Sequence, residues 1–170
     1  MPTSSKQSST SSDSRRSRKS DAPPASSADV RRRMQATRQR DTPAEVALRS
    51  VLHGLGLRFR VQRSPIAGLR RRADIVFAPA RVAVFVDGCF WHGCPEHATW
   101  PKTNARWWRE KIEGNRSRDA DTDARLAAAG WLSVRVWTHE ESAEAAERIA
   151  CVVRSRRQNG IRTRSKVSVG

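Results

Sequence analysis

The sequence predicts an α/β domain in which a mixed central sheet is flanked by helices. Its apolar patterns follow the order helix, strand, strand, strand, helix, strand, helix, which favours a sheet with helices packed against it. The chain has 170 residues with 37% hydrophobic content, which leaves room for one domain with a substantial core and not for two. No internal repeat is visible in it.

The first expected helix begins after Thr42, a good N-cap residue. Pro43 stands at the first helical position and Glu45 follows the cap by three residues, which is the pattern of a capping box. Glu45 therefore has a complete structural explanation. Apolar residues then recur at helical spacing, and two glycines suit the end of the helix: Val46, Leu48, Val51, Leu52 and Leu55, then Gly54 and Gly56.

Four strands are expected from runs of apolar and β-branched residues. They cover Leu57–Gln62, Ala73–Phe77, Val82–Val86 and Trp131–Trp137. The second and third are close in sequence, so we expect them to pair as a hairpin through residues 78–81.

Two longer helices complete the expected domain. The first covers Ala105–Ala129, and Gly114-Asn115 weakens its middle, so a split into two helices stays open. The last covers Ser142–Arg156 and contains Cys151, which we expect to be a small core residue.

The net charge of +16 is concentrated toward the two ends of the chain. Residues 1–40 hold 10 Lys and Arg against 3 acidic residues, and residues 154–170 hold 6 against none. The middle is close to balance, with 17 basic against 14 acidic residues. Basic arms favour a polyanion through phosphate contacts and counterion release, although a solvated tail is the simpler explanation for residues 1–29.

Composition also sets the expected boundaries. Residues 1–29 are Ser-rich with almost no large apolar residue, so we expect a disordered tail there. One domain is expected over residues 30–156, and its first segment, 30–41, carries an arginine cluster around Met34 that could lie against a nucleic acid. A basic tail over residues 157–170 would follow.

The three cysteines are an odd number, which argues against a disulfide framework and for a reducing compartment. No apolar run approaches the length that spans a membrane, and the N-terminus has no apolar signal-peptide core. We therefore expect a soluble, intracellular protein.

The loop after the third expected strand has the spacing of a metal site. Cys89 and Cys94 have four residues between them, and Cys94 and His97 form a C-x-x-H step. Thiolate sulfur and imidazole nitrogen are the ligands that tetrahedral Zn²⁺ prefers, and a closed structural site needs a fourth ligand. His139, just beyond the run Trp131–Trp137, is the best candidate for it. The alternative is a reduced, buried cysteine pair with surface histidines.

Asp74 is a second candidate for metal binding. It stands among apolar, β-branched residues and follows the run Arg70-Arg71-Arg72. A carboxylate there is poorly suited to burial unless it is paired or binds a cation. The expected hairpin places it on one sheet with the strand that leads to His92. A cation site and a salt bridge to one of the preceding arginines both stay open.

A longer pattern around these residues resembles a known family. The run VDGCFWHGCPEH, with WPKTN-x-x-W-W after it and RDT-x-x-E before it, resembles the very-short-patch mismatch repair endonucleases. The resemblance runs from about Met34 to His139. It implies a restriction-endonuclease-like fold with a structural zinc loop. It also implies Mg²⁺-dependent nicking of one DNA strand beside the thymine of a T:G mismatch, which arises when 5-methylcytosine is deaminated.

The resemblance implies a role for each residue of the site. Asp74 and the backbone carbonyl of Val86 would hold a catalytic Mg²⁺, and His92 would be the general base or water-positioning group. The strand after Asp74 lacks the lysine of the general restriction-nuclease signature, so His92 carries more of the reaction. Glu45 gains a second role, near the metal, that competes with capping. Asp87 stands where some members have a histidine, and it either binds metal or initiates the turn.

The resemblance also places residues against DNA. Phe90 and Trp91 would enter the base stack beside the mismatch, with core packing as the alternative for Phe90. Met34 falls where the family has an apolar wedge. Lys102 and Arg118 could contact phosphates or belong to a solvated face. Asn115, Arg118 and Asp119 fit the family pattern N-x-x-R-D.

The implied partners are double-stranded DNA with a T:G mismatch and mismatch-repair proteins, for a monomer associated with the nucleoid in the cytoplasm. Two other classes of function stay open. One is a non-catalytic DNA-binding protein stapled by zinc, with a purely structural Asp74. The other is a basic RNA-associated protein whose tails do most of the binding.

Overall fold

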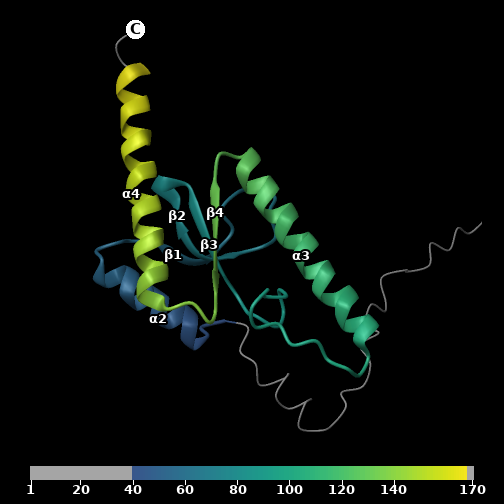
Figure 1. Ribbon diagram of the computed structural model, residues 1–170. Coiled ribbons are helices and arrows are strands. Elements are labelled where there is room, and N and C mark those ends of the chain that lie inside the picture. The colour runs from purple at the N-terminus through teal and green to yellow at the C-terminus, as the bar shows by residue number, and fades with distance from the viewer. Residues whose placement is uncertain (1–39, 168–170) are drawn as a thin grey trace, which may run out of the picture.

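The computed structural model describes residues 40–167, which form a four-stranded sheet with helices around it (Figure 1). The strand order is β1-β2-β3-β4, with bounds Arg60–Arg63, Ala73–Phe77, Val82–Asp87 and Leu132–Trp137. The helices are α2 (Pro43–Gly54), α3 (Ala105–Ala128) and α4 (Ser142–Val167), and a short 3₁₀ helix, η1 (Ala78–Ala80), joins β2 to β3. The predicted α/β class and the order of elements are confirmed.

The sheet is mixed, as predicted. β1, β2 and β3 are antiparallel, whereas β3 and β4 are parallel. A parallel pair needs a long crossover, and α3 is part of the one between β3 and β4. Asp87 is opposite Trp137 in the register, so the carboxyl ends of β3 and β4 meet at one edge of the sheet. The loops that follow these two strands therefore begin side by side.

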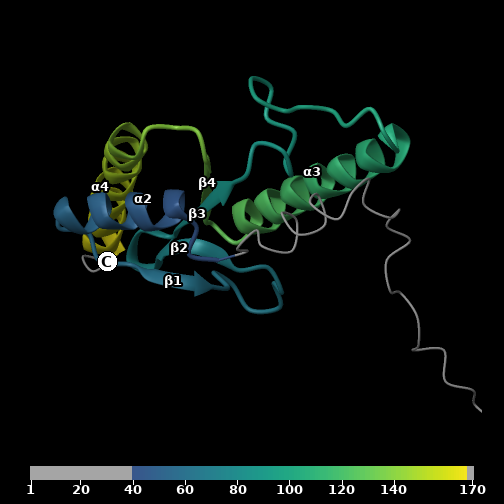
Figure 2. The same ribbon diagram turned by 90° about the horizontal axis from the view of Figure 1, so that it is seen from below.

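Alternating side chains of the strands build two cores on opposite faces of the sheet. One contains Ile75, Phe77, Val82 and Val84 with residues of α2 and α4, and the other contains Val76, Ala83 and Phe85 with Leu126 of α3. In both views α2 and α4 lie side by side, away from α3 (Figures 1 and 2). Burying one large apolar side chain contributes about 1.5–3 kcal/mol, so these cores fix the sheet between its helices. Among the helices described, none is long and apolar enough to cross a membrane.

Three details differ from the prediction, and the open question of a split in α3 is settled. β1 begins at Arg60 and not at Leu57, because the Leu57 N–H donates to the Leu52 carbonyl (3.1 Å) and closes the end of α2. α3 runs through Gly114-Asn115 without a break, and α4 continues to Val167. The prediction of Cys151 as a core residue is wrong, since it lies exposed on α4.

Candidate active site and metal centre

The loop after β3 and the loop after β4 together form a cluster of metal-binding atoms. Ligand atoms of Cys89, Cys94, His97 and His139 all lie within 4.8 Å of one another. The sulfur of Cys89 is 3.1 Å from Nδ1 of His139, and the sulfur of Cys94 is 3.8 Å from the same nitrogen. A tetrahedral Zn²⁺ ion with bonds of about 2.0–2.3 Å separates its ligand atoms by about 3.3–3.8 Å. The separations in the cluster, from 3.1 Å up to at most 4.8 Å, lie around this range, so the four residues could hold a metal ion.

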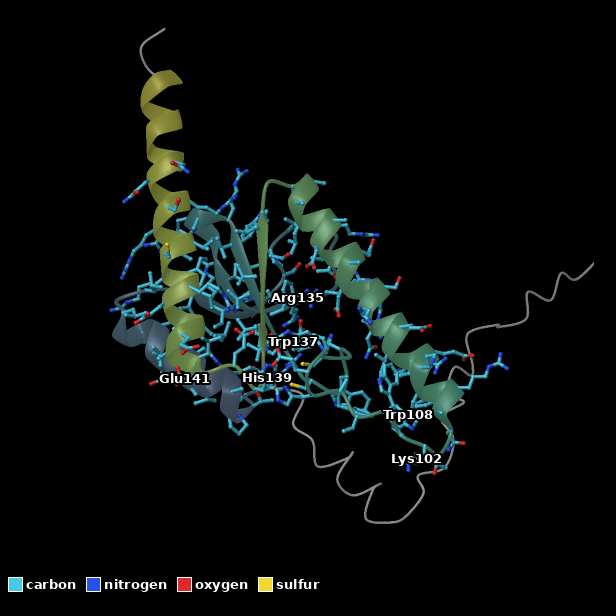
Figure 3. The ribbon with its side chains drawn as sticks, viewed as in Figure 1. Lys102, Trp108, Arg135, Trp137, His139 and Glu141 are labelled. Carbon is cyan, nitrogen blue, oxygen red and sulfur yellow. The ribbon has the colours of Figure 1, made fainter. Side chains whose placement is uncertain are left out.

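The local fold explains why these atoms meet. The Thr138 N–H donates to the Asp87 carbonyl (3.0 Å), which extends the parallel pairing past the strand ends and brings His139 to the loop after β3. That loop then turns through a hydrogen bond from the Cys94 N–H to the Cys89 carbonyl (2.9 Å). Figure 3 shows sulfur atoms next to the labelled His139 at this edge of the sheet. His139 therefore lies next to the Cys89 and Cys94 side chains, where a fourth ligand would be needed.

A glycine keeps the loop close to α3. Gly93 has a φ of 62°, in the left-handed region, and a Cβ built on it would lie 3.0 Å from Cγ2 of Ile112. A side chain at this position would therefore strain the backbone and press on α3. The close approach places His92, its neighbour in sequence, next to the same helix.

Asp74 is held by two hydrogen bonds, one to each carboxylate oxygen. Oδ1 accepts from Nε2 of Gln62 and Oδ2 accepts from the Val86 N–H, both at 2.8 Å. The carboxylate is largely buried, and burial raises its pKa above the usual value; the two hydrogen bonds act in the opposite direction, and the negative charges of Glu45 and Asp87 add to the rise. No arginine in the part of the chain that the structure describes forms an ion pair with Asp74, so the salt-bridge alternative is not observed.

Glu45 is buried, at 4% exposure, and forms half of the predicted capping box, since its carboxylate accepts from the Asp41 N–H (3.2 Å) in place of the Thr42 N–H. Its Oε1 accepts from the Thr42 hydroxyl (3.0 Å), and its backbone N–H donates to that hydroxyl (3.3 Å). Its Oε2 accepts from Arg49 (3.2 Å). Even so, the carboxylate is near enough to Asp74 to affect its pKa. Capping therefore does not move Glu45 away from the candidate site.

His92 is anchored by a carboxylate of α3. Its Nδ1 is 2.6 Å from Oδ2 of Asp119 and 3.7 Å from Oδ1 of Asp87. A carboxylate only accepts hydrogen bonds, so Nδ1 is the donor in this contact, and in a neutral ring with this tautomer Nε2 carries the lone pair. No partner for Nε2 occurs within the described ranges. The arrangement can orient an imidazole for proton transfer.

Asp87, predicted either to bind metal or to initiate the turn, contacts two side chains of the site. Its carboxylate, 5% exposed, lies between His92 and Arg135 of β4, and its Oδ2 accepts from Nη1 of Arg135 at 2.7 Å. A cavity of about 540 Å³ opens beside this group, with Asp87, His92, Asp119 and Arg135 in its lining. Asp74 does not line the cavity. Asp87 thus lines the cavity, and its negative charge also contributes to the raised pKa of the buried Asp74.

Phe90 and Trp91 form an aromatic cluster with two tryptophans of α3. The Phe90 ring lies 5.1 Å from Trp91 and 5.2 Å from Trp108, and Trp107 lies 4.7 Å from Trp108. All four rings are half-buried. They are thus packed on one another while part of each surface stays accessible. Trp100, at 51% exposure, is more open than any of them.

The predicted DNA contacts are spread over the loop and α3. Lys102 is exposed just before α3, where Figure 3 labels it near Trp108. Arg118 is exposed and hydrogen-bonds Asn115, whose Nδ2 donates to the Trp91 carbonyl (2.7 Å). Arg118 therefore also supports the aromatic loop. Met34 lies outside the described residues.

Four residues of this region were not assigned a role from the sequence: Gln62, Trp108, Asp119 and Arg135. Asp119 was visible in the N-x-x-R-D pattern, and Arg135 was visible as a charge inside an apolar strand run. Their partners are 27 or more residues away in several contacts, which no local pattern reveals.

A buried carboxylate, a histidine anchored by a second carboxylate and a cluster of Cys and His side chains are together compatible with a nuclease site. The profile of the family described as "DNA mismatch endonuclease Vsr" matches residues 26–97. The type II nicking enzyme V.NaeI of Lentzea aerocolonigenes is 45% identical over 124 residues, which cover 72% of this chain and 73% of that protein.

Two further relatives agree. The type II nicking enzyme V.XorIIP of Xanthomonas oryzae pv. oryzae is 46% identical over 111 residues, covering 64% of this chain and 79% of that protein. The DNA mismatch endonuclease Vsr of Escherichia coli is 40% identical over 108 residues, covering 61% and 65%. The chain belongs to the Vsr family of DNA mismatch endonucleases. It is a DNA endonuclease, which decides among the three functions that the sequence left open.

Proposed function

We propose that this endonuclease is Mg²⁺-dependent and strand-specific, and that it nicks DNA beside the thymine of T:G mismatches to start very-short-patch repair. The observation that carries the proposal is that Asp119 anchors His92, which lies 3.7 Å from Asp87, a residue whose charge also acts on the buried Asp74. The relatives support nicking and action at mismatches, since one relative is a mismatch endonuclease and another is a nicking enzyme.

Asp74 and the backbone carbonyl of Val86 would hold the Mg²⁺ ion. Carboxylate and carbonyl oxygens suit this hard cation. The Val86 N–H already holds the Asp74 carboxylate next to the backbone of Val86. When bound, Mg²⁺ supplies positive charge against the scissile phosphate and the departing oxygen. Glu45 adds negative charge nearby, which favours a cation at Asp74.

His92 takes the proton of the attacking water. The water oxygen forms a bond to phosphorus as the water proton passes to Nε2 of His92, and one phosphorus–oxygen ester bond breaks. The leaving oxygen keeps the electron pair of that bond and takes a proton from solvent water. Asp119 accepts from Nδ1 throughout, so it fixes the tautomer and balances the charge of the imidazolium that forms. Asp87 lies 3.7 Å from the same ring nitrogen and adds a second negative charge there.

Zn²⁺ at Cys89, Cys94, His97 and His139 would have a structural role. The ligands come from two loops and leave no open position if all four bind, which is typical of structural sites. His92 lies between Cys89 and Cys94 in the chain, so a rigid loop keeps its ring aimed.

The half-buried Phe90 and Trp91 would enter the base stack, where a mismatch has lowered the cost of unstacking. Lys102 and Arg118 would contact phosphates, and Met34 would act from an arm over residues 30–41 that precedes the described domain. The basic segments 1–29 and 157–170 would add affinity without sequence preference.

A nicking assay tests the proposal directly. Duplexes labelled on either strand carry a single T:G pair in several flanking sequences, with T:A and C:G pairs as controls. We expect a Mg²⁺-dependent nick on the thymine strand alone, reduced by about 10²-fold or more in both Asp74→Asn and His92→Ala. Equal cutting of the T:A duplex would contradict the mismatch specificity. Tight binding without a nick in any sequence context would contradict the reaction itself.

A further inference from the structure

Arg135 stands at the centre of a group of three aspartates beside His92. It lies on β4, and its side chain is 24% exposed. Its guanidinium donates to Asp87 of β3 at 2.7 Å and to Asp123 of α3 at 3.0 and 3.2 Å, and it lies 3.4 Å from Asp119. Figure 3 shows Arg135 between β4 and α3.

The oxygen atoms in these contacts are divided in a regular way. Asp87 directs Oδ2 to Arg135 and Oδ1 to Nδ1 of His92. Asp119 directs Oδ1 to Arg135 and Oδ2 to the same Nδ1. The guanidinium therefore fixes the rotation of two carboxylates whose remaining oxygens converge on one ring nitrogen.

The guanidinium is itself held in place. Asp123 accepts from both Nε and Nη2 of Arg135, a two-bond contact that defines the plane of the group. Its carbon Cζ lies 5.1 Å from the centre of the Phe85 ring, which covers one side. A lysine could supply the charge at this position but not the planar fork that reaches three carboxylates at once.

Without this cation the local charges would oppose one another. Asp87, Asp119 and Asp123 would then be close together, in part buried, with only the histidine ring between two of them. Like charges in such a place repel, so the two carboxylates would separate and the ring would lose its fixed partner. A purely apolar side chain in β4 would satisfy the packing of the sheet but not this arrangement.

We propose that Arg135 is a positioning residue for His92, which orients the Asp87 and Asp119 carboxylates so that the ring presents Nε2 to the reacting water. The proposal rests on the role proposed for His92 above. Arg135 does not touch the substrate in this scheme and acts only through the two aspartates. It also gives Asp87 a role, as the second support of the ring and not as a metal ligand.

Arg135→Lys is the first test, measured as single-turnover nicking of the T:G duplex. We expect the rate constant to fall by about 10-fold to 10²-fold, the order for a misplaced catalytic group, while the Kd for DNA changes by less than about 3-fold. The matched control is Arg71→Lys. Arg71 pairs with Asp121 of the same helix at 2.6 Å and does not contact His92, so both quantities should stay within about 2-fold of the wild type.

A spectroscopic measurement separates this proposal from the proposed reaction. Long-range ¹H–¹⁵N spectra report which ring nitrogen of His92 carries the proton. We expect the Nδ1–H tautomer alone in the wild-type and Arg71→Lys proteins, and a mixture of tautomers in Arg135→Lys. Normal nicking by His92→Ala would overturn the proposed reaction. The tautomer measurement would still show whether Arg135 orients the His92 ring.

Two results would overturn the role of Arg135. One is wild-type nicking by Arg135→Lys in a series where His92→Ala is inactive. The other is a loss of rate that accompanies an equal loss of DNA affinity, zinc content and thermal stability, with the tautomer unchanged. If Arg135→Lys does not fold, Asp123→Asn replaces it, since it keeps the guanidinium and removes the two-bond contact. We then expect a 3-fold to 10-fold fall in rate, and an unchanged rate with an unchanged tautomer overturns the proposal.

Discussion

The two side chains proposed to act on the phosphate are held in opposite ways. Asp74 accepts hydrogen bonds from two neutral groups, Gln62 and the Val86 N–H, and burial together with neighbouring carboxylates raises its pKa. His92 instead contacts the carboxylates of Asp87 and Asp119, whose charge Arg135 offsets.

Charge therefore has different roles around Asp74 and around His92. The surroundings of Asp74 are short of positive charge, so a cation is the partner that would relieve it. The surroundings of His92 already contain their cation, so the ring is oriented in advance of any ligand. Loss of a part on one side should therefore leave the other side largely intact.

Loss of the proposed zinc site should have the largest effect, because it should disturb His92 and leave Asp74 in place. In Cys94→Ser we expect nicking to fall by at least about 10²-fold, because the loop that aims His92 loses its staple. Cation binding at Asp74 should change by less than about 3-fold, since β1, β2 and β3 hold that residue. Zinc content by mass spectrometry, single-turnover nicking and a Mn²⁺ titration followed by electron paramagnetic resonance measure the three quantities.

The matched control is Cys151→Ser, which changes an exposed cysteine of α4 far from the loop in sequence. It should retain zinc, nicking and Mn²⁺ affinity. Full nicking by zinc-free Cys94→Ser, or a parallel loss of Mn²⁺ binding, would show that the two sides are not independent.

Two carboxylate-to-amide changes should move stability in opposite directions. Without Mg²⁺, Asp74→Asn should raise the free energy of unfolding at pH 7 by on the order of 1 kcal/mol, because it removes a buried charge that burial disfavours. Asn can accept from the Val86 N–H and donate to a turned Gln62 amide. Asp119→Asn should lower the free energy of unfolding by about 1 kcal/mol or less, since its partly exposed ion pairs are screened.

The pH dependence of the first change has a definite sign. The pKa of Asp74 is raised in the folded state, so the cost of its charge is present above the folded pKa and vanishes as the pH falls toward 3.8, the usual pKa of an aspartate. The advantage of Asp74→Asn should therefore disappear in acid. Urea unfolding at several pH values measures this, and an advantage that persists below pH 3.8 would contradict the assignment.

Local patterns were sufficient for the elements of the fold and for the cluster of Cys and His side chains that could bind a metal. The Thr42 cap, the hairpin through residues 78–81 and the Cys89–Cys94–His97 spacing each depend on residues that are close in the chain. His139 was also predictable, since it follows a strand that had to return to the sheet.

The supports of the site were not predictable in the same way. The contact between His92 and Asp119 spans 27 residues, and the one between Asp87 and Arg135 spans 48. Both depend on how α3 lies against the sheet, which packing decides and sequence periodicity does not. The end of α4 was mispredicted for a similar reason, because a run rich in arginine resembles a tail and yet continues the helix.

Gln62→Glu should have the smallest effect of these changes, and it tests whether Asp74 lacks or already has enough negative charge around it to bind a cation. Gln62 sits in a strand with a φ of 51°, a conformation that costs a non-glycine residue energy, and its amide donates to Asp74. Glutamate keeps the shape and replaces the donor by a second negative charge. We expect Mn²⁺ affinity to rise by about 3-fold to 10-fold, since added ligand charge tightens cation sites, while stability without metal falls by on the order of 1 kcal/mol.

Gln62→Met is the control, because it keeps a similar length but brings neither donor nor charge. It should lower stability slightly and leave Mn²⁺ affinity unchanged or weaker. If Gln62→Glu binds Mn²⁺ no better than Gln62→Met, a further negative charge does not help a cation at Asp74. The surroundings of Asp74 would then not be short of positive charge, and Asp74 and His92 would differ only in the geometry of their contacts.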